Sequence, residues 1–220
     1  IARDLSVALF GDEPGLAAYY RFDEGHGNWS VDATAGGPPL SLSSPIWISS
    51  GAQISTGIAR NTVEFGGSAS ARASNVVTTL TSGFTLEVWV RWDGGTAPQA
   101  VMYNGNNAAN GYGIYLANGV AQFVEGGRGS VTCTTCTLVP GVWAHIAVER
   151  NASQVLMFQN GVMKLVSSSL AAPASPGGVL SLASNTSGGD RLIGAVDEVR
   201  VWTILLLRLL RRFVRHLAVP

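Results

Sequence analysis

The stretch Phe84–Trp92, FTLEVWVRW, decides the fold class of this chain because its residues alternate in character along their whole length. Apolar residues stand at every second position, namely Phe84, Leu86, Val88, Val90 and Trp92. The positions between them hold Thr85, Glu87, Trp89 and Arg91. Because successive side chains of a strand point to opposite faces, this pattern predicts a strand with one buried face.

Similar short apolar runs continue on both sides of this stretch, separated by Gly, Ser, Asn and Pro. Two separators are Asn-Gly pairs, Asn118-Gly119 and Asn160-Gly161, which favour two-residue hairpin turns because both positions tolerate positive φ. The other runs predicted as strands are Leu16–Phe22, Leu40–Ile48, Thr62–Phe65, Ala100–Tyr103, Tyr112–Leu116, Val120–Val124, Val142–Glu149, Gln154–Gln159, Val162–Val166, Val179–Ala183 and Ala195–Trp202. Many short strands with almost no helix before residue 203 predict an all-β fold, a two-sheet antiparallel jelly-roll sandwich.

The composition agrees with a folded domain and excludes several classes of function. Of the 220 residues, 46% are hydrophobic and only 13% are charged, whereas disordered chains combine high charge with few large apolar residues. Fourteen Lys and Arg residues balance fourteen Asp and Glu residues. Because no basic excess is available, we expect no nucleic-acid partner. A single all-β domain is ordinary at this length.

Two cysteines stand close together in the Thr-rich stretch VTCTTC, which ends at Cys136. A CxxC pair is typical of redox proteins or of half a zinc site. Zinc would need two further ligands, and the chain has three scattered histidines. A redox pair would begin a helix, whereas this stretch has the character of a strand. We therefore predict a local disulfide between Cys133 and Cys136 across a turn, with free thiols or a metal site as the alternatives.

Seven segments, taken in order, carry a resemblance to a known family. They are GLAAYYRFDEGHG (Gly15–Gly27), VDATAGG (Val31–Gly37), VEFGG (Val63–Gly67), GFTLEVWVRWDG (Gly83–Gly94), GVWAHIAVER (Gly141–Arg150), VLMFQNGVMK (Val155–Lys164) and GAVDEVRVW (Gly194–Trp202). Together they resemble the laminin-G-like, concanavalin A-like jelly-roll superfamily. The resemblance implies a domain over residues 15–202, preceded in 1–14 by the linker and tail of an earlier repeat of a tandem array. It also implies an extracellular location, calcium, and glycans or other surface ligands.

Carboxylates near the first and last predicted strands are the candidates for calcium. Asp23 and Glu24 follow the first strand, Asp32 lies in the next loop, and Asp197 and Glu198 lie in the last strand. Calcium takes six to eight oxygen ligands, and the neighbouring Gly-rich turns leave backbone carbonyls available. Adjacent strand residues point to opposite faces, and the resemblance favours Asp197 over Glu198. The predicted ligands of a structural Ca²⁺ are therefore Asp23, Glu24, Asp32 and Asp197, and the alternative is that these are solvated loop acids.

The Asn- and Gly-rich loop YNGNNAANGYGIY, Tyr103–Tyr115, is the second candidate site. Amide side chains pair donors with acceptors, and aromatic rings cover the apolar face of a sugar. The residues predicted to bind a glycan are Trp29, Asn104, Asn106, Asn107, Asn110 and Tyr112. The alternative is a long surface loop in which Asn and Gly serve turn geometry.

The segment after Trp202 breaks the strand pattern. Ile204–Leu217 has helical period, with Arg208, Arg211, Arg212 and Arg215 on one stripe and leucines on another. We therefore predict that 203–220 is a Leu/Arg-rich C-terminal amphipathic helix. Three interpretations stay open: the leucines pack on the sandwich or on a neighbouring repeat, residues 203–217 contact an anionic membrane surface, or a frame-shifted gene has replaced the family's polar tail. Membrane contact is the least favoured of these.

Sequence signatures of catalysis are missing from the chain. Jelly-roll glucanases carry E-x-D-x-x-E on one strand, which places two acids on one face, and no such triplet occurs here. G-x-S-x-G, H-E-x-x-H and the P-loop are also absent. We therefore expect no enzyme but an extracellular binding module, one repeat of a larger adhesion-type protein, with a glycan or an extracellular protein as ligand and neighbouring repeats as partners. The alternatives are a purely structural spacer repeat and a degenerate jelly-roll glycoside hydrolase relative.

Overall fold

The computed structural model describes residues 7–52, 61–74 and 83–206, and the elements within them are all β-strands. These are β1 (Leu16–Tyr20), β2 (Trp29–Ser30), β3 (Leu40–Ser43), β4 (Ile46–Ile48), β5 (Thr62–Gly66), β6 (Ser70–Ala73), β7 (Gly83–Trp92), β8 (Pro98–Asn104), β9 (Tyr112–Ala117), β10 (Val120–Glu125), β11 (Gly129–Thr137), β12 (Trp143–Asn151), β13 (Val155–Gln159), β14 (Val162–Ser167), β15 (Leu180–Leu182) and β16 (Ile193–Trp202).

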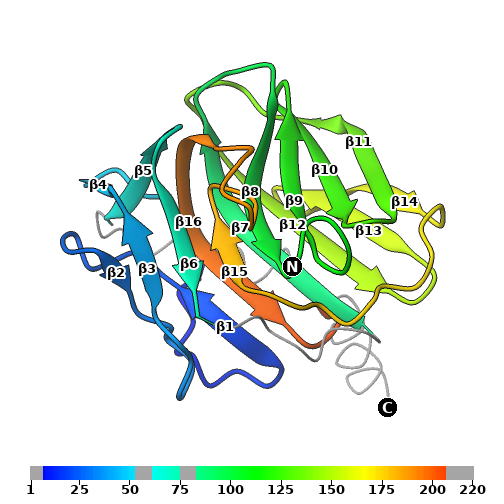
Figure 1. Ribbon diagram of the computed structural model, residues 1–220, viewed down its shortest axis with the longest axis horizontal. Helices are drawn as coiled ribbons and strands as arrows, with labels where there is room; N and C mark the ends of the chain where they lie inside the picture. The colour runs from blue at the N-terminus through cyan, green and yellow to red at the C-terminus, as the bar shows by residue number, and fades with distance from the viewer. Residues whose placement is uncertain (1–6, 53–60, 75–82, 207–220) are drawn as a thin grey trace, which may run out of the picture.

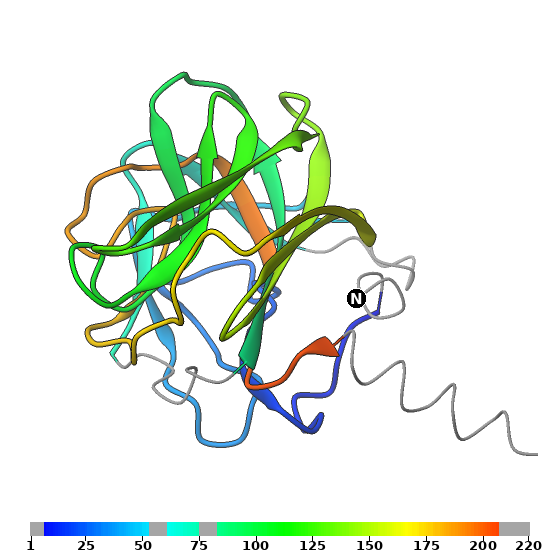
Figure 2. The same ribbon diagram turned by 90° about the vertical axis from the view of Figure 1, so that its right-hand side faces the viewer.

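The strands form two antiparallel sheets, which confirms the predicted sandwich of the jelly-roll type (Figure 1). One sheet has the order β14-β13-β12-β7-β16-β5-β4, and β1 pairs with β16 beside this path. The other has the order β11-β10-β9-β8-β15-β6-β3-β2. Figure 2 shows the blue strand β1 beside the orange-red end of β16, so the first and last strands of the domain are neighbours.

Strand β7 lies at the centre of the first sheet, between β12 and β16, as its alternating sequence predicts. Its side chains Phe84, Leu86 and Val88 are fully buried in the main core between the sheets. Its opposite face is also covered, because Glu87 is fully buried there. The first sheet is therefore packed on both faces around this residue.

The structure differs from the strand predictions in two places. The run Leu40–Ile48 is two strands in different sheets, with β3 in the second sheet and β4 in the first. The chain turns between them at Ser44, whose φ is 51°, and at Pro45, which has no N–H for a ladder. Strands β2 and β6 were not predicted, because WS and SARA are too short and too poor in large apolar residues to show a period.

Both predicted Asn-Gly hairpin turns are confirmed. Asn118 and Gly119 have φ values of 50° and 74°, and they join β9 to β10. Asn160 and Gly161 have φ values of 50° and 76°, and they join β13 to β14. Positive φ at both central positions is the geometry of the type I′ turn, which matches the twist of the paired strands.

Cys133 and Cys136 form the predicted disulfide, with an S–S distance of 2.01 Å. The bond lies at an irregularity in β11. Thr132 lies opposite Gln122 and Thr137 lies opposite Val120, so β11 advances five residues where β10 advances two. Both cysteines are buried in the main core. The disulfide therefore holds the extra residues of β11 against the sandwich.

From position 207 onward the predicted C-terminal helix lies outside the described residues. Residues 203–205 are not helical, and Leu206 is the one described residue with helical geometry. Leu206 itself is buried against Trp202 and Tyr19, outside the main core. In the part of the chain that is described, no helix has the length and apolar character to cross a membrane.

Candidate functional site

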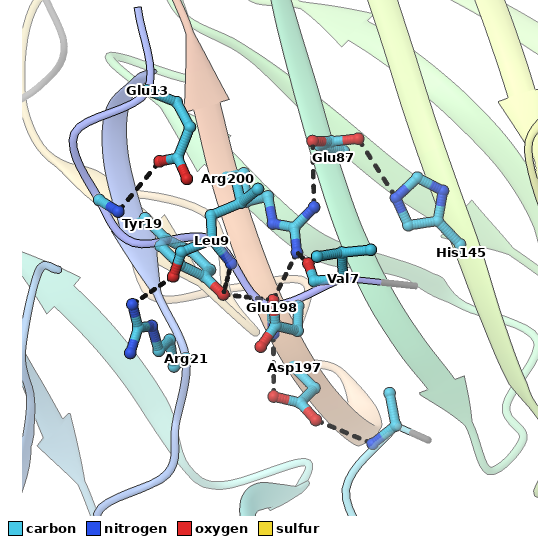
Figure 3. Close-up of polar contacts among 12 residues, drawn as sticks. Val7, Leu9, Glu13, Tyr19, Arg21, Glu87, His145, Asp197, Glu198 and Arg200 are labelled. Carbon is cyan, nitrogen blue, oxygen red and sulfur yellow. Dashed lines mark hydrogen bonds and ion pairs between the residues drawn. The ribbon is translucent and has the colours of Figure 1, made fainter. Parts of the chain in front are cut away.

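The segment Val7–Glu13, called here the N-terminal strap, lies across the outer face of the first sheet (Figure 3). Arg200 of β16 donates from Nη2 to the carbonyl oxygen of Val7 at 2.7 Å, and Arg21 donates to the carbonyl of Leu9. The amide of Leu9 donates to the hydroxyl oxygen of Tyr19 at 3.3 Å. Part of the stretch predicted to be a linker from a preceding repeat is therefore packed on this domain.

A cluster of charged side chains is buried under the strap. Arg200 donates from Nη2 to Glu198 Oε2 at 2.6 Å, and its Nη1 lies 3.7 Å from Glu87 Oε1. The hydroxyl of Tyr19 donates to Glu198 Oε2 at 2.5 Å. On the other side of Glu87, His145 Nε2 lies 3.4 Å from Oε2. We call these residues, Tyr19, Glu87, His145, Glu198 and Arg200, the buried polar cluster (Figure 3).

Two pKa shifts describe the electrostatics of this cluster. Burial raises the pKa of Glu87, but hydrogen bonding from His145, the charge of Arg200 and the indole of Trp202 outweigh it and lower that pKa to about 2. Burial, together with the charge of Glu198, raises the pKa of Tyr19 to about 12. The members are at most 1% exposed, so no ligand from solvent reaches them. The cluster therefore supports the strap and does not form a binding surface.

The structure corrects the expectation that Asp197 and Glu198 point to opposite faces. Asp197 lies opposite Trp89 and Arg200 lies opposite Glu87, so β16 inserts one residue between positions that are two apart in β7. The inserted residue is Glu198, whose φ of 51° is in the left-handed region. Such a bulge interrupts the alternation of side chains. Both carboxylates consequently lie on the outer side of the first sheet, as Figure 3 shows.

A pocket of about 490 Å³ opens beside the strap. Its lining residues are Phe10, Arg21, Asp23, Glu24, Val31 and Ala33. Phe10 is 88% exposed, yet its backbone is held in place, because the two carboxylate oxygens of Glu13 accept from the amides of Phe10 at 2.7 Å and Gly11 at 3.0 Å. The strap therefore presents an aromatic ring at the edge of a charged pocket.

The predicted calcium ligands separate into different surroundings. Asp23 and Glu24 line the pocket, where the Oε1 atom of Glu24 accepts from the amide of Val31 at 2.7 Å. Asp32 is buried, and its Oδ1 atom accepts from the amides of Tyr19 and Thr34 and from the Thr34 hydroxyl.

Asp197 is buried in the middle of β16, within hydrogen-bond distance of Ala52. Its two oxygens accept from the amides of Ala52 and Glu198. Burial, the charge of Glu198 and, more weakly, the charge of Asp23 raise its pKa well above the usual range. In the described ranges no group of three or more Asp, Glu, His and Cys side chains is placed to hold a metal.

The predicted glycan-binding residues do not share one site. Asn104 and Tyr112 are buried, and Tyr112 stacks on Phe84 at a centroid distance of 4.3 Å, so both pack in the interior and do not face a ligand. This corrects their assignment to a surface site. The reason is that Tyr112 lies in β9, on its core face.

The remaining asparagines form hydrogen bonds within the loop or tie it to the segment around Thr186. Asn106 Oδ1 accepts from the amide of Ala108, and Asn107 Oδ1 accepts from the hydroxyls of Thr186 and Ser187. The amide of Asn110 donates to the carbonyl of Asn106. Trp29 is different, because it is 50% exposed and stands two residues before Val31 of the pocket.

Phe10 and Arg21 of the pocket were not predicted. The sequence signal that could have found the strap is the apolar run Val7–Phe10, which is unusual in a solvated linker. Its placement beside Asp23 and Glu24 depends on the pairing of β1 with β16, which no local pattern shows.

Comparisons with known proteins agree with this architecture. A family model described as the concanavalin A-like lectin/glucanases superfamily matches residues 65–208. A search of curated proteins gave no match. Among solved structures, domain 4 of AbnA, a GH43 extracellular arabinanase from Geobacillus stearothermophilus in complex with arabinotriose, is 18% identical with a TM-score of 0.64. The match covers 85% of this chain and 91% of that domain.

Two further structures share the fold over part of their length. The binding domain of Paraclostridial Mosquitocidal Protein 1 is 12% identical with a TM-score of 0.62, and the match covers 87% of this chain and 49% of that one. Trypanosoma rangeli sialidase in complex with 2,3-difluorosialic acid is 12% identical with a TM-score of 0.64, over 89% of this chain and 32% of that one. At these identities the likeness shows the fold alone.

Proposed function

Because the chain belongs to the concanavalin A-like lectin/glucanases superfamily, we propose that it is a non-catalytic extracellular carbohydrate-binding module. The observation that carries the proposal is the pocket beside the strap, in which an exposed aromatic ring stands next to charged side chains. A sugar ring has an apolar face that packs on an aromatic ring and hydroxyls that bond to carboxylates. In this proposal the module is one repeat of a larger adhesion-type protein.

Two observations support the extracellular location and the ligand-binding role in this proposal. The disulfide between Cys133 and Cys136 is a bond that persists in oxidising compartments. Glu24 already accepts a hydrogen bond from the amide of Val31, which suits a carboxylate that orients a ligand. Domain 4 of the arabinanase, which shares this fold, was solved with a bound arabinotriose, and neutral oligosaccharides are therefore the first ligands to test.

Calcium binding remains a prediction, and we now propose two of the four predicted acids as its ligands. In the described residues no three of these acids are grouped to hold a metal, and Asp32 Oδ1 already accepts three hydrogen bonds. The charge of Asp23 contributes weakly to the raised pKa of Asp197, and we propose that these two acids, with backbone carbonyl oxygens, would hold a structural Ca²⁺. The ion would offset the negative charge of the Asp197 carboxylate, because burial disfavours its ionised form.

The binding proposal is tested with a glycan array, followed by calorimetry on the strongest ligand. We expect Phe10→Ala to weaken binding at least tenfold, about 1.4 kcal/mol, because it removes the stacking ring. Val139→Ala is the matched control, since Val139 is exposed but does not line the pocket. Arrays that stay blank for glycans and for extracellular proteins would favour a structural spacer instead.

The competing enzyme hypothesis has its own test. The protein is incubated with arabinan and β-glucans, and reducing ends are measured. Hydrolysis by the wild type that is lost in the double variant Asp23→Asn/Glu24→Gln would assign a glycoside hydrolase and overturn the non-catalytic proposal.

A further inference from the structure

We propose that the pocket beside the strap selects uncharged glycans and rejects acidic ones such as sialylated or uronic acid sugars. This inference rests on the proposed carbohydrate-binding function and deepens it by naming the ligand class. It depends on three features of the pocket: what its arginine already binds, which charges stand around it, and how its lining divides into apolar and polar parts.

The arginine of the pocket is already engaged by the protein. Arg21 donates from Nη2 to the carbonyl of Leu9 in the strap, and its guanidinium carbon lies 5.1 Å from the centroid of the Tyr19 ring. Recognition of a carboxylate uses a free, forked guanidinium that donates two parallel hydrogen bonds. Because one arm of Arg21 holds the strap, this residue is poorly placed to capture the carboxylate of an acidic sugar.

Among the described residues that line the pocket, the other charged side chains are Asp23 and Glu24, and both are acidic. Glu13 stands on the strap next to Phe10, with both of its oxygens turned to backbone amides. An acidic sugar would bring a further negative charge to this edge, and like charges placed together at an interface are unfavourable.

The lining divides into an apolar part and a polar part. Phe10, Val31 and Ala33 are the apolar part, and Phe10 and Val31 are both exposed. Asp23 and Glu24 supply only oxygen acceptors when ionised, which suits the hydroxyl donors of a neutral sugar. A neutral sugar ring could therefore stack on Phe10 while its hydroxyls donate to the two carboxylates.

The test compares matched glycans on the whole chain in EDTA at low salt, so that the carboxylates act without a cation. Lactose is compared with 3′-sialyllactose, and arabinotriose with trigalacturonic acid, by calorimetry. We expect the acidic member of a pair to bind at least tenfold more weakly, with the difference shrinking as salt is added. Equal or tighter binding of the acidic member would overturn the inference.

Variants test whether the preference for neutral over acidic glycans arises in the pocket. Asp23→Asn/Glu24→Gln should narrow the difference within a pair, whereas Asp12→Asn, an exposed acid of the strap that does not line the pocket, should leave it unchanged. Discrimination that persists in the double variant would contradict the inference, while binding that depends on Phe10 would still support the proposed function. If none of the glycans binds, the proposed function and this inference both fail.

Discussion

Arg200 donates from Nη2 to the carbonyl oxygen of Val7 at 2.7 Å and so joins residues 193 positions apart. Val7 is the first residue of the described chain, and Arg200 lies in the last strand, within the buried polar cluster. The same nitrogen donates to Glu198, so the strap is tied to an internal ion pair and not only to the sheet surface. The pocket wall that Phe10 forms therefore depends on charges buried behind it.

Replacing the cation of the cluster should be strongly destabilising. Arg200 is 1% exposed and faces both Glu87 and Glu198, so Arg200→Met removes the cation that these buried carboxylates share. Breaking a buried ion pair on one side costs about 3–5 kcal/mol. We expect a loss of that size in urea unfolding. Arg128→Met, at an exposed arginine, is the control and should change stability by less than about 1 kcal/mol.

The low pKa of Glu87 predicts a specific loss of stability in acid. Its pKa is about 2 in the folded protein against 4.5 as the ordinary value, so its ionised form stabilises the fold above about pH 4.5. That contribution, roughly 3 kcal/mol, should disappear as the pH falls from about 4.5 toward 2. Unfolding measured between pH 7 and pH 2 should show this slope in the wild type.

The variant Glu87→Gln isolates this contribution. It should be less stable than the wild type at pH 7. Its free energy of unfolding should fall less steeply in acid, because the variant has no carboxyl group to titrate at position 87. Glu64→Gln, at a partly exposed acid, should retain the slope. Parallel acid limbs in the wild type and Glu87→Gln would show that the slope comes from other groups.

Glu13 is predicted to position Phe10 for ligand binding. Its two oxygens hold the amides of Phe10 and Gly11, so Glu13→Ala should loosen the strap around the aromatic ring. We expect a three- to tenfold loss of glycan affinity by calorimetry, about 0.7–1.4 kcal/mol, with little change in unfolding. Glu13→Gln keeps one oxygen acceptor and should recover part of the affinity. A variant Glu13→Ala that binds like the wild type would refute this role.

Calcium should raise the thermal stability if Asp23 and Asp197 hold the ion. A ligand at a hundredfold excess over its dissociation constant stabilises by about 2.7 kcal/mol, so melting with calcium and with EDTA should differ by several degrees. Asp197→Asn should abolish the difference. Val139→Ala should retain it, since Val139 is exposed and its side chain has no oxygen to offer the ion. Identical melting curves for the wild type in millimolar calcium and in EDTA would exclude the ion.

The disulfide within β11 should contribute modestly to stability, because it closes a short loop. The pair Cys133→Ala/Cys136→Ala should lose about 2 kcal/mol from the loop-closure term. Urea unfolding with and without a reductant measures this loss. The double variant should be insensitive to the reductant, and a wild type that is equally insensitive would indicate that the bond is absent in solution.

Much of the fold was predictable because short-range sequence patterns determine its strands and turns. The alternation in Phe84–Trp92 requires a strand, and Asn-Gly requires a turn with positive φ. Neither depends on distant residues. The run Leu40–Ile48 shows the limit of this reasoning, since its apolar character predicts a strand but does not say that its halves join different sheets.

The candidate site was predictable only in part. Asp23 and Glu24 were identified by residue type, and both line the pocket. Tyr112 was assigned to the ligand by its polar neighbours in the sequence, yet it lies in the core because the register of β9 turns its ring toward Phe84. Residue type suggests chemistry, whereas burial depends on which face of which sheet a residue occupies.

The sequence by itself determined the all-β class, the hairpins and the pairing of two nearby cysteines, because alternation, turn chemistry and short separations act within a few residues. Only the tertiary structure decided which charges meet. The bulge at Glu198 places two adjacent acids on one face, and the pairing of β1 with β16 brings the strap to Arg200. Both are contacts across long separations, whose energies depend on burial and geometry that no local pattern contains.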